Sequence, residues 1–273
     1  MNGFDYRRAA SPAQATAWLR EDPDAKLLAG GQSLLAAIKL RLAAPSALID
    51  LQDMPELSAV REDAQSVWIG AMCSHASAAA SPVVRKRLPM LAMLAANIAD
   101  QQVRNRGTMG GSLANADPAA CWAAGLLAMN GVVCTDRREI AADNFFCGLF
   151  TTALEPDELL MGVRFAPCTQ AHYLKFEQPA SRFAMVGVAV SRQSQSVRVA
   201  LTGLGHGVCR WPEAENALTR QFSPDALNDI RLDPEQATGD LHASADYRAH
   251  LAAVLARRAV EQALTNSEAL TAH

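Results

Sequence analysis

A polar, glycine-rich segment at residues 101–118 lies between two apolar runs, at 88–99 and 122–129. It reads QQVRNRGTMGGSLANADP and is unlike the sequence on either side. Glycine and asparagine favour turns, and proline ends helices, so we predict a loop here rather than buried regular structure. A polar loop between two buried elements is a place where a ligand can be held.

The residue types in this loop favour a phosphate. Gly107, Gly110 and Gly111 have no Cβ, so the backbone can approach a bulky anion and turn its N–H groups toward it. Thr108 and Ser112 add hydroxyl donors. A glycine-rich surface turn without a ligand explains one such loop at least as well, so this loop alone does not establish a phosphate site.

A second loop of the same kind occurs at residues 27–34, LLAGGQSL. The end of an apolar strand is followed by a Gly30-Gly31 turn, and then by Ser33 as the expected N-cap of a helix over 34–42. A strand, a glycine turn and a helix N-terminus together bind anions through free N–H groups. We therefore expect the two turns to face one cleft and to hold a pyrophosphate from both sides through main-chain amides. Neither turn matches the Rossmann or P-loop pattern.

The pair of motifs, AGGQSL at 29–34 and RNRGTMGGSLANADP at 104–118, resembles the FAD-binding medium subunits of the molybdenum hydroxylases, the xanthine dehydrogenase family. The likeness is greatest to carbon monoxide dehydrogenase medium subunits, and it covers essentially the whole chain. It implies an α+β fold, with a two-part FAD-binding domain of the PCMH/vanillyl-alcohol-oxidase type and a small C-terminal antiparallel sheet with helices. We expect the FAD-binding domain over 1–175, with subdomains at about 1–57 and 58–175, and the C-terminal domain over 176–273.

The resemblance implies non-covalent FAD, held by residues of both turns. The first turn supplies Leu28, Ala29, Gly30, Gly31, Gln32, Ser33 and Leu34, and the second supplies Thr108, Gly110, Gly111, Ser112 and Asp117. By position in the family, Leu159 and Lys175 lie beside the flavin, where a cation can stabilise a reduced, anionic ring. We expect no catalytic residue in this chain, because the chemistry belongs to the cofactor.

Two departures from the family pattern keep an alternative open. Many members read A-D-P-x-x-D after the second motif, whereas residues 116–121 read ADPAAC, with Asp117 kept and Cys121 in place of the second carboxylate. A thiol cannot accept a hydrogen bond from a hydroxyl as a carboxylate does. Residues 178–182, QPASR, also differ from their more basic counterparts. A non-catalytic assembly subunit that has lost its cofactor is therefore a second hypothesis, and a free-standing flavin reductase is a third, although no nicotinamide motif is visible.

The partners are also implied by the resemblance. They are an iron–sulfur small subunit and a molybdenum large subunit, in a dimer of heterotrimers where electrons reach FAD and then an external acceptor such as NAD, quinone or oxygen. None of the six cysteines forms a C-x-x-C pair, so molybdopterin and 2Fe–2S clusters are expected only in the partner subunits.

Bulk properties narrow the setting further. A net charge of −3 argues against nucleic acid as a partner. No apolar run reaches the roughly 18 residues of a membrane-spanning helix. The start of the chain lacks the apolar core of a signal peptide, so we expect a cytoplasmic protein without a membrane span.

Overall fold

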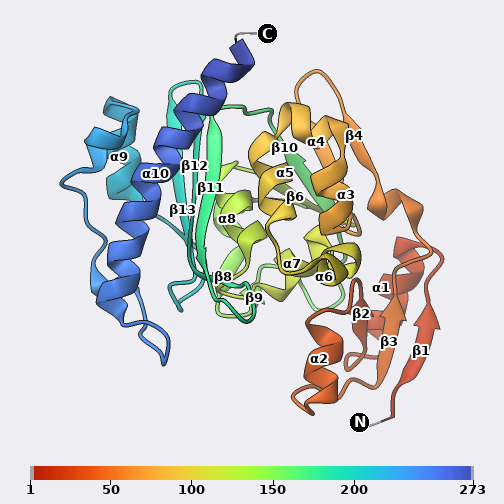
Figure 1. Ribbon diagram of the computed structural model, residues 1–273. Helices are drawn as coiled ribbons and strands as arrows, with labels where there is room; N and C mark the ends of the chain where they lie inside the picture. Colours follow the sequence, from red (N-terminus) through yellow and green to blue (C-terminus); the bar gives the residue numbers. More distant parts are fainter. Residues whose placement is uncertain (1–2, 272–273) are drawn as a thin grey trace.

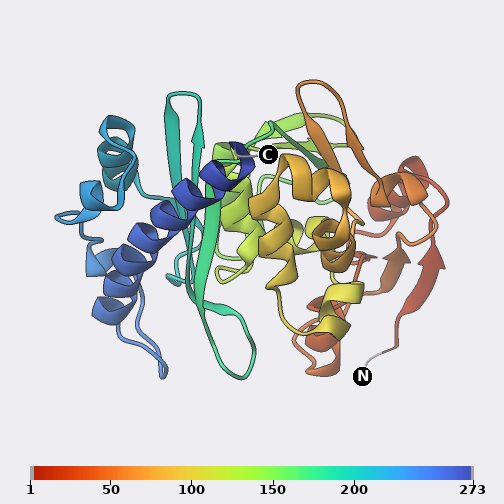
Figure 2. The same ribbon diagram turned by 45° about the horizontal axis from the view of Figure 1, so that its top comes forward.

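The computed structural model describes residues 3–271 and has a mixed α and β architecture built around three sheets (Figures 1 and 2). Figure 1 shows an N-terminal unit in red and orange, a helix-rich central unit, and a C-terminal sheet crossed by a long helix. The predicted α+β fold with a C-terminal antiparallel sheet is confirmed.

The N-terminal unit is a parallel sheet of order β1-β3-β2 with helices packed on it. Its elements are β1 (Asp5–Arg8), α1 (Pro12–Glu21), β2 (Lys26–Leu28), α2 (Leu34–Lys39), β3 (Ala47–Asp50) and the 3-10 turn η1 (Pro55–Ser58). Helix α1 begins after Ser11, because the Ser11 hydroxyl accepts a hydrogen bond from the Gln14 amide and Pro12 occupies the first turn. Strand β2 ends immediately before the first glycine turn, which therefore lies at the carboxyl edge of the sheet.

The central unit is a five-stranded antiparallel sheet of order β4-β5-β10-β6-β7, covered by short helices. The strands are β4 (Val60–Glu62), β5 (Val67–Gly70), β6 (Val132–Thr135), β7 (Glu139–Ala141) and β10 (Leu160–Phe165). The helices are α3 (His75–Ala80), α4 (Pro82–Arg87), α5 (Pro89–Ala96), α6 (Gln101–Arg106), α7 (Met109–Asn115) and α8 (Cys121–Ala128), and the 3-10 turn η2 (Ala142–Asn144) precedes the hairpin of β8 (Phe146–Gly148) and β9 (Thr151–Thr152). Every residue of α8 is buried, which makes it the central helix of this core.

The prediction of an irregular loop over 101–118 is wrong, because helices α6 and α7 occupy most of it. Asp100 caps α6 by accepting a hydrogen bond from the Val103 amide at 2.8 Å. Thr108 caps α7 by accepting one from the Gly111 amide at 3.1 Å. Such caps satisfy N–H groups that a short helix would otherwise leave unpaired, and this outweighs the low helix propensity of glycine.

The C-terminal sheet has the order β11-β12-β13-β14 and is antiparallel throughout. Its elements are β11 (Ala171–Glu177), β12 (Ala184–Gln193), β13 (Ser196–Thr202), β14 (Cys209–Arg210), α9 (Pro212–Arg220), the 3-10 turns η3 (Pro224–Leu227) and η4 (Pro234–Gln236), and α10 (Ala245–Thr271). Helix α10 crosses one face of the sheet (Figure 1), and α8 packs on the other. Buried hydroxyls join the sheet to the central unit, since Ser191 donates to the Ala128 carbonyl at 2.6 Å and Thr202 to the Pro118 carbonyl at 2.7 Å.

Candidate cofactor site

A cavity of about 510 Å³ lies between the N-terminal and central units and is lined by both glycine turns. The expectation that the two turns face one cleft is confirmed. The lining includes Ala29, Gly30, Gly31, Gln32, Ser33 and Leu34 from the first turn, Thr108, Gly110, Gly111, Ser112 and Asp117 from the second, and Leu159. Two predicted site residues lie behind the wall instead: Leu28 is buried in a small core with Ile38, and Lys175 does not reach the lining.

The two turns touch each other at Gly30. A Cβ on Gly30 would overlap the carbonyl oxygen of Arg106 and lie 2.7 Å from the Gly107 Cα. Gly31 has φ +72°, a left-handed conformation that side chains disfavour. Glycine is thus needed at 30 for the close approach of the two backbones and at 31 for the turn.

The first turn leaves its amides available to a ligand. Within residues 3–271, the N–H groups of Gly31, Gln32 and Ser33 donate no hydrogen bond. The predicted capping role of Ser33 is wrong, because its backbone is helical and its hydroxyl makes no capping bond to α2. Since these residues line the cavity, their amides and the Ser33 hydroxyl are suited to bind an anion there.

The amides of residues 109–112 in the second turn are already bonded, whereas the Thr108 N–H donates no hydrogen bond within residues 3–271. Met109 donates to the Cys73 carbonyl at 3.0 Å, and Gly110 donates to the Ala71 carbonyl at 2.8 Å. The Gly111 amide is taken by the Thr108 hydroxyl, and Ser112 donates to the Thr108 carbonyl at 3.0 Å. The expectation that main-chain amides of both turns grip a pyrophosphate therefore fails for 109–112, because those groups fix α7 to the segment that follows β5 and to its own first turn. This turn presents side-chain groups to the cavity, among them those of Ser112, Asn115 and Asp117.

His75 is a cavity residue that the sequence analysis missed. Its ring is buried, its Nδ1 accepts a hydrogen bond from Trp122 Nε1 at 3.0 Å, and its Nε2 faces Gly107. Burial, with a smaller effect of the Arg104 guanidinium, lowers the pKa of His75 to about 4. The ring is therefore neutral at pH 7 and carries its proton on Nε2, which makes it a fixed donor beside the second turn. No spacing pattern points to it, because its partner Trp122 lies far along the sequence.

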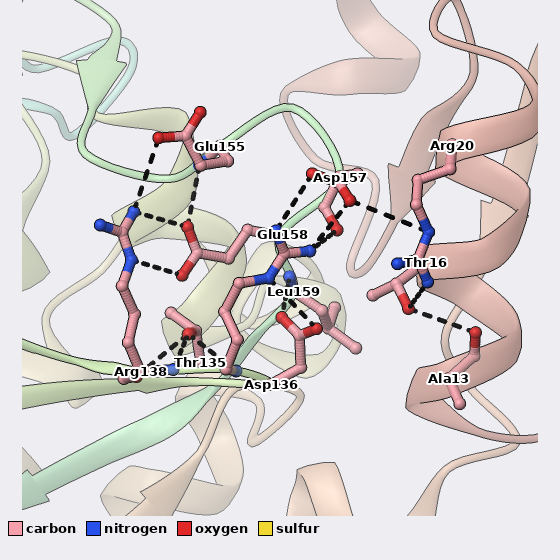
Figure 3. Close-up of polar contacts among 11 residues, drawn as sticks. Ala13, Thr16, Arg20, Thr135, Asp136, Arg138, Glu155, Asp157, Glu158 and Leu159 are labelled. Carbon is pink, nitrogen blue, oxygen red and sulfur yellow. Dashed lines mark hydrogen bonds and ion pairs between the residues drawn. The ribbon is translucent and has the colours of Figure 1, made fainter.

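Ion pairs hold the segment that carries Leu159, and Glu158 in this segment also lines the cavity (Figure 3). Arg138 donates to both carboxylate oxygens of Glu158, at 2.9 and 2.7 Å, and Arg138 is the main reason that the pKa of Glu158 is lowered to about 2. The Leu159 amide donates to Asp136 at 2.8 Å. These contacts fix the backbone of the cavity wall at Leu159.

The same cluster reaches the N-terminal unit. Arg137 pairs with Asp157 at 3.0 Å, and Arg20 on helix α1 lies 3.9 Å from the same carboxylate (Figure 3). The charged cluster therefore ties together the two units that enclose the cavity.

Lys175 acts on the cavity through a loop. Its ammonium donates to the Arg182 carbonyl at 2.6 Å, and Ser181, Arg182 and Phe183 line the cavity. Lys175 therefore holds the β11–β12 loop against the site. Cys121, at the start of α8, also lines the cavity.

Within residues 3–271 no group of three or more His, Cys, Asp or Glu side chains is placed to hold a metal ion. No helix in that range has both the length and the apolar character needed to cross a membrane.

Comparison with known families accounts for both parts of the chain. The model of the FAD binding domain in molybdopterin dehydrogenase matches residues 2–167. The model of the CO dehydrogenase flavoprotein C-terminal domain matches residues 171–263.

Individual relatives agree over almost their whole length. The chain is 38% identical to the nicotine 6-hydroxylase medium subunit of Paenarthrobacter nicotinovorans, covering 94% of this chain and 96% of that one. It is 36% identical to the carbon monoxide dehydrogenase medium chain of Hydrogenophaga pseudoflava, covering 95% and 96%. A solved structure of carbon monoxide dehydrogenase from Hydrogenophaga pseudoflava matches with a TM-score of 0.87 at 35% identity, covering 97% of this chain and 98% of that one.

The cavity, the two domains and these relatives agree with one another. The chain belongs to the family of FAD-binding medium subunits of the molybdenum hydroxylases, and it is an oxidoreductase subunit.

Proposed function

We propose that this chain binds FAD non-covalently in the cavity between residues 30–33 and 108–112, and that it passes electrons from 2Fe–2S clusters of a small partner subunit to an external acceptor. The complex would also contain a molybdenum large subunit, as a cytoplasmic dimer of heterotrimers. The observation that carries the proposal is the cavity lined by both glycine turns. The first turn has free amides there, and its backbone at Gly30 contacts the backbone of the second turn at Arg106 and Gly107.

The cavity residues fit a dinucleotide. The volume lies within the range of cofactor sites, and the lining is mostly apolar with a few placed donors. The amides of Gly31, Gln32 and Ser33 would hold the diphosphate, and Ser112 would face it from the second turn. Leu159 would pack on the ring system, and Lys175 would keep the 181–183 loop over it.

FAD supplies the electron-transfer chemistry when bound, and the chain supplies binding and orientation. His75 would offer the N–H of its neutral ring as a donor at the cavity wall, and its charge would not change near pH 7. The ion pairs that hold the segment with Leu159 would keep the wall at a fixed distance from the ring.

The test is absorbance of the purified protein, as isolated and after incubation with FAD, compared with a Gly111→Glu variant. A Cβ at 111 would lie 2.8 Å from the Thr108 hydroxyl and close to Ala29 in the first turn, so glutamate places bulk and negative charge between the turns. We expect flavin bands in the native protein and none in the variant. Gly3→Glu is the matched control, because a Cβ there meets nothing within 4 Å.

The assembly-subunit hypothesis remains the second candidate, because Cys121 lines the cavity where a carboxylate is usual in the family. It predicts that the chain co-purifies with the iron–sulfur and molybdenum subunits while colourless, even under saturating FAD. A flavin spectrum in that complex, with bleaching when the substrate of the molybdenum subunit is added, would exclude it and support the electron path.

A further inference from the structure

A polar cluster surrounds Cys121, because Lys175 and Tyr173 of β11 both lie close enough to oppose the rise that burial causes in the pKa of its thiol. Cys121 is the first residue of α8 and lines the cavity. Tyr173 and Lys175 share one face of β11, since neighbouring side chains of a strand point to opposite faces. Tyr173 belongs to the same apolar core as Cys121, whereas Leu174 packs toward α10.

The hydroxyl of Tyr173 lacks a partner. It is fully buried and has no hydrogen-bond partner of normal geometry. Burial, and then a weak polar contact with the Cys121 thiol, raise the pKa of Tyr173. A thiol is a weak acceptor, and a buried donor without an acceptor costs free energy. The surroundings of Cys121 therefore contain a donor that the cysteine does not satisfy.

Lys175 adds a second donor and a positive charge. Its side chain is 6% exposed, and its ion-pair partner Glu177, at 3.5 Å, is half exposed and so screened by water. Burial raises the pKa of the Cys121 thiol and outweighs the opposing effects of Lys175 and Tyr173. The thiol is therefore neutral and supplies no negative charge. The N-terminus of α8 also lacks a side-chain cap, because Ala120 occupies the N-cap position.

We propose that position 121 is the acceptor position of this cluster, and that cysteine there leaves the Tyr173 hydroxyl without an anionic partner and leaves the Lys175 charge with only the half-exposed Glu177 as its partner. This inference rests on the proposed function, because its consequence concerns bound FAD. A positive charge near the ring stabilises the negative charge that the ring takes up on reduction, so Cys121 makes the cofactor easier to reduce than a carboxylate would. Cys121 is thus a residue that tunes the reduction potential.

The first test is a double-mutant cycle in the apoprotein, followed by chemical denaturation, with Cys121→Asp and Tyr173→Phe. With cysteine at 121, Tyr173→Phe is expected to leave stability unchanged or to raise it, because the lost hydroxyl has no partner. With aspartate at 121, the same change is expected to lower the folding equilibrium constant by about tenfold, or ~1.4 kcal/mol, because a hydrogen bond to a carboxylate is lost.

Cys121→Ala is the control, because alanine offers neither an acceptor nor a charge. Its cycle with Tyr173→Phe should be additive. An aspartate cycle as additive as the alanine cycle would overturn the proposal, whether or not the protein binds FAD.

The second test is the midpoint potential of the FAD-loaded protein, measured for the native chain, Cys121→Asp and Cys121→Asn. Aspartate is expected to shift the potential to a lower value, and asparagine, which accepts a hydrogen bond without charge, to shift it less. Equal potentials in all three proteins would refute the tuning role. Failure of all three to bind FAD would instead refute the proposed function. The double-mutant cycle in the apoprotein would then still test whether position 121 accepts a hydrogen bond from Tyr173.

Discussion

The two glycine turns look alike in sequence, yet they serve the cavity in opposite ways. The first turn keeps the amides of Gly31, Gln32 and Ser33 free, and α2 after it has no side-chain cap. The second turn bonds its amides at 109–112 to the segment that follows β5 and to Thr108, and it packs Gly110 against Ala71. The first turn therefore has free N–H donors for a ligand, whereas the amides at 109–112 of the second turn are already bonded to protein groups.

The largest effect that would break this comparison is expected at Gly110. A Cβ there would lie 2.5 Å from the Ala71 Cβ and 2.7 Å from its Cα, with no flexible side chain to move. Gly110→Ala should destabilise the fold by about 3 kcal/mol through overpacking. Gly111→Ala, which meets only the Thr108 hydroxyl at 2.8 Å, should cost about 1 kcal/mol. Chemical denaturation measures the unfolding free energy of both variants. Equal losses would show that the second turn accommodates a methyl group equally well at 110 and at 111.

A pH effect of about 2–3 kcal/mol is expected from His75 behind the second turn. Its pKa in the folded protein is about 4, below the ordinary value of 6.5, so the unfolded chain binds the extra proton between these values. Stability from this group is therefore full above about pH 6.5 and is lost as the pH falls toward 4.

The measurement is the unfolding free energy across that window. His75→Asn, which keeps an acceptor for Trp122, should flatten the dependence, whereas His250→Asn on the exposed face of α10 should not. An unchanged slope in His75→Asn would contradict the assignment of a neutral buried ring.

A smaller difference separates the two hydroxyls that begin the helices. Thr108→Ala removes a capping bond of 3.1 Å and should cost about 1 kcal/mol. Ser33→Ala removes no capping bond, so the stability of the apoprotein should stay within about 0.5 kcal/mol of native. Ser33→Ala should weaken FAD binding, which titration of flavin fluorescence measures. A stability loss as large at 33 as at 108 would remove the distinction between the turns.

The subtlest expected effect concerns exchange rates alone. Binding of FAD should slow amide hydrogen exchange at residues 31–33 and change it little at 109–112, whose amides are bonded already. Hydrogen exchange read by mass spectrometry, with and without FAD, gives the answer. Comparable protection at both turns would mean that the second turn also orders on binding.

The sequence predicts those parts of the fold that depend on local signals. Serine as an N-cap residue marks the helices that begin after Ser11, Ser74 and Ser81, because each serine hydroxyl accepts a hydrogen bond from the amide three residues further on. The same rule, applied to Asp100 and Thr108, would have found α6 and α7. The glycines of this segment favour turns, and a prediction based on them overlooks the two helix caps.

Other features of the site depend on contacts that no local pattern contains. The His75–Trp122 hydrogen bond and the Arg138–Glu158 pair join residues on different elements, and only the tertiary structure brings them together. Lys175 shows what the resemblance leaves out, since it places this residue beside the flavin but gives no sign that its ammonium donates to the carbonyl of the cavity-lining residue Arg182. Whether the predicted residues contact FAD stays a prediction.

The hydroxyl of Thr202 and the amide of Gly203 both bond to the Pro118 carbonyl, next to Asp117 and Ala119 in the cavity wall. A partner whose docking tightened this junction would have its binding linked thermodynamically to cofactor retention, and by reciprocity a chain without flavin would bind that partner less tightly.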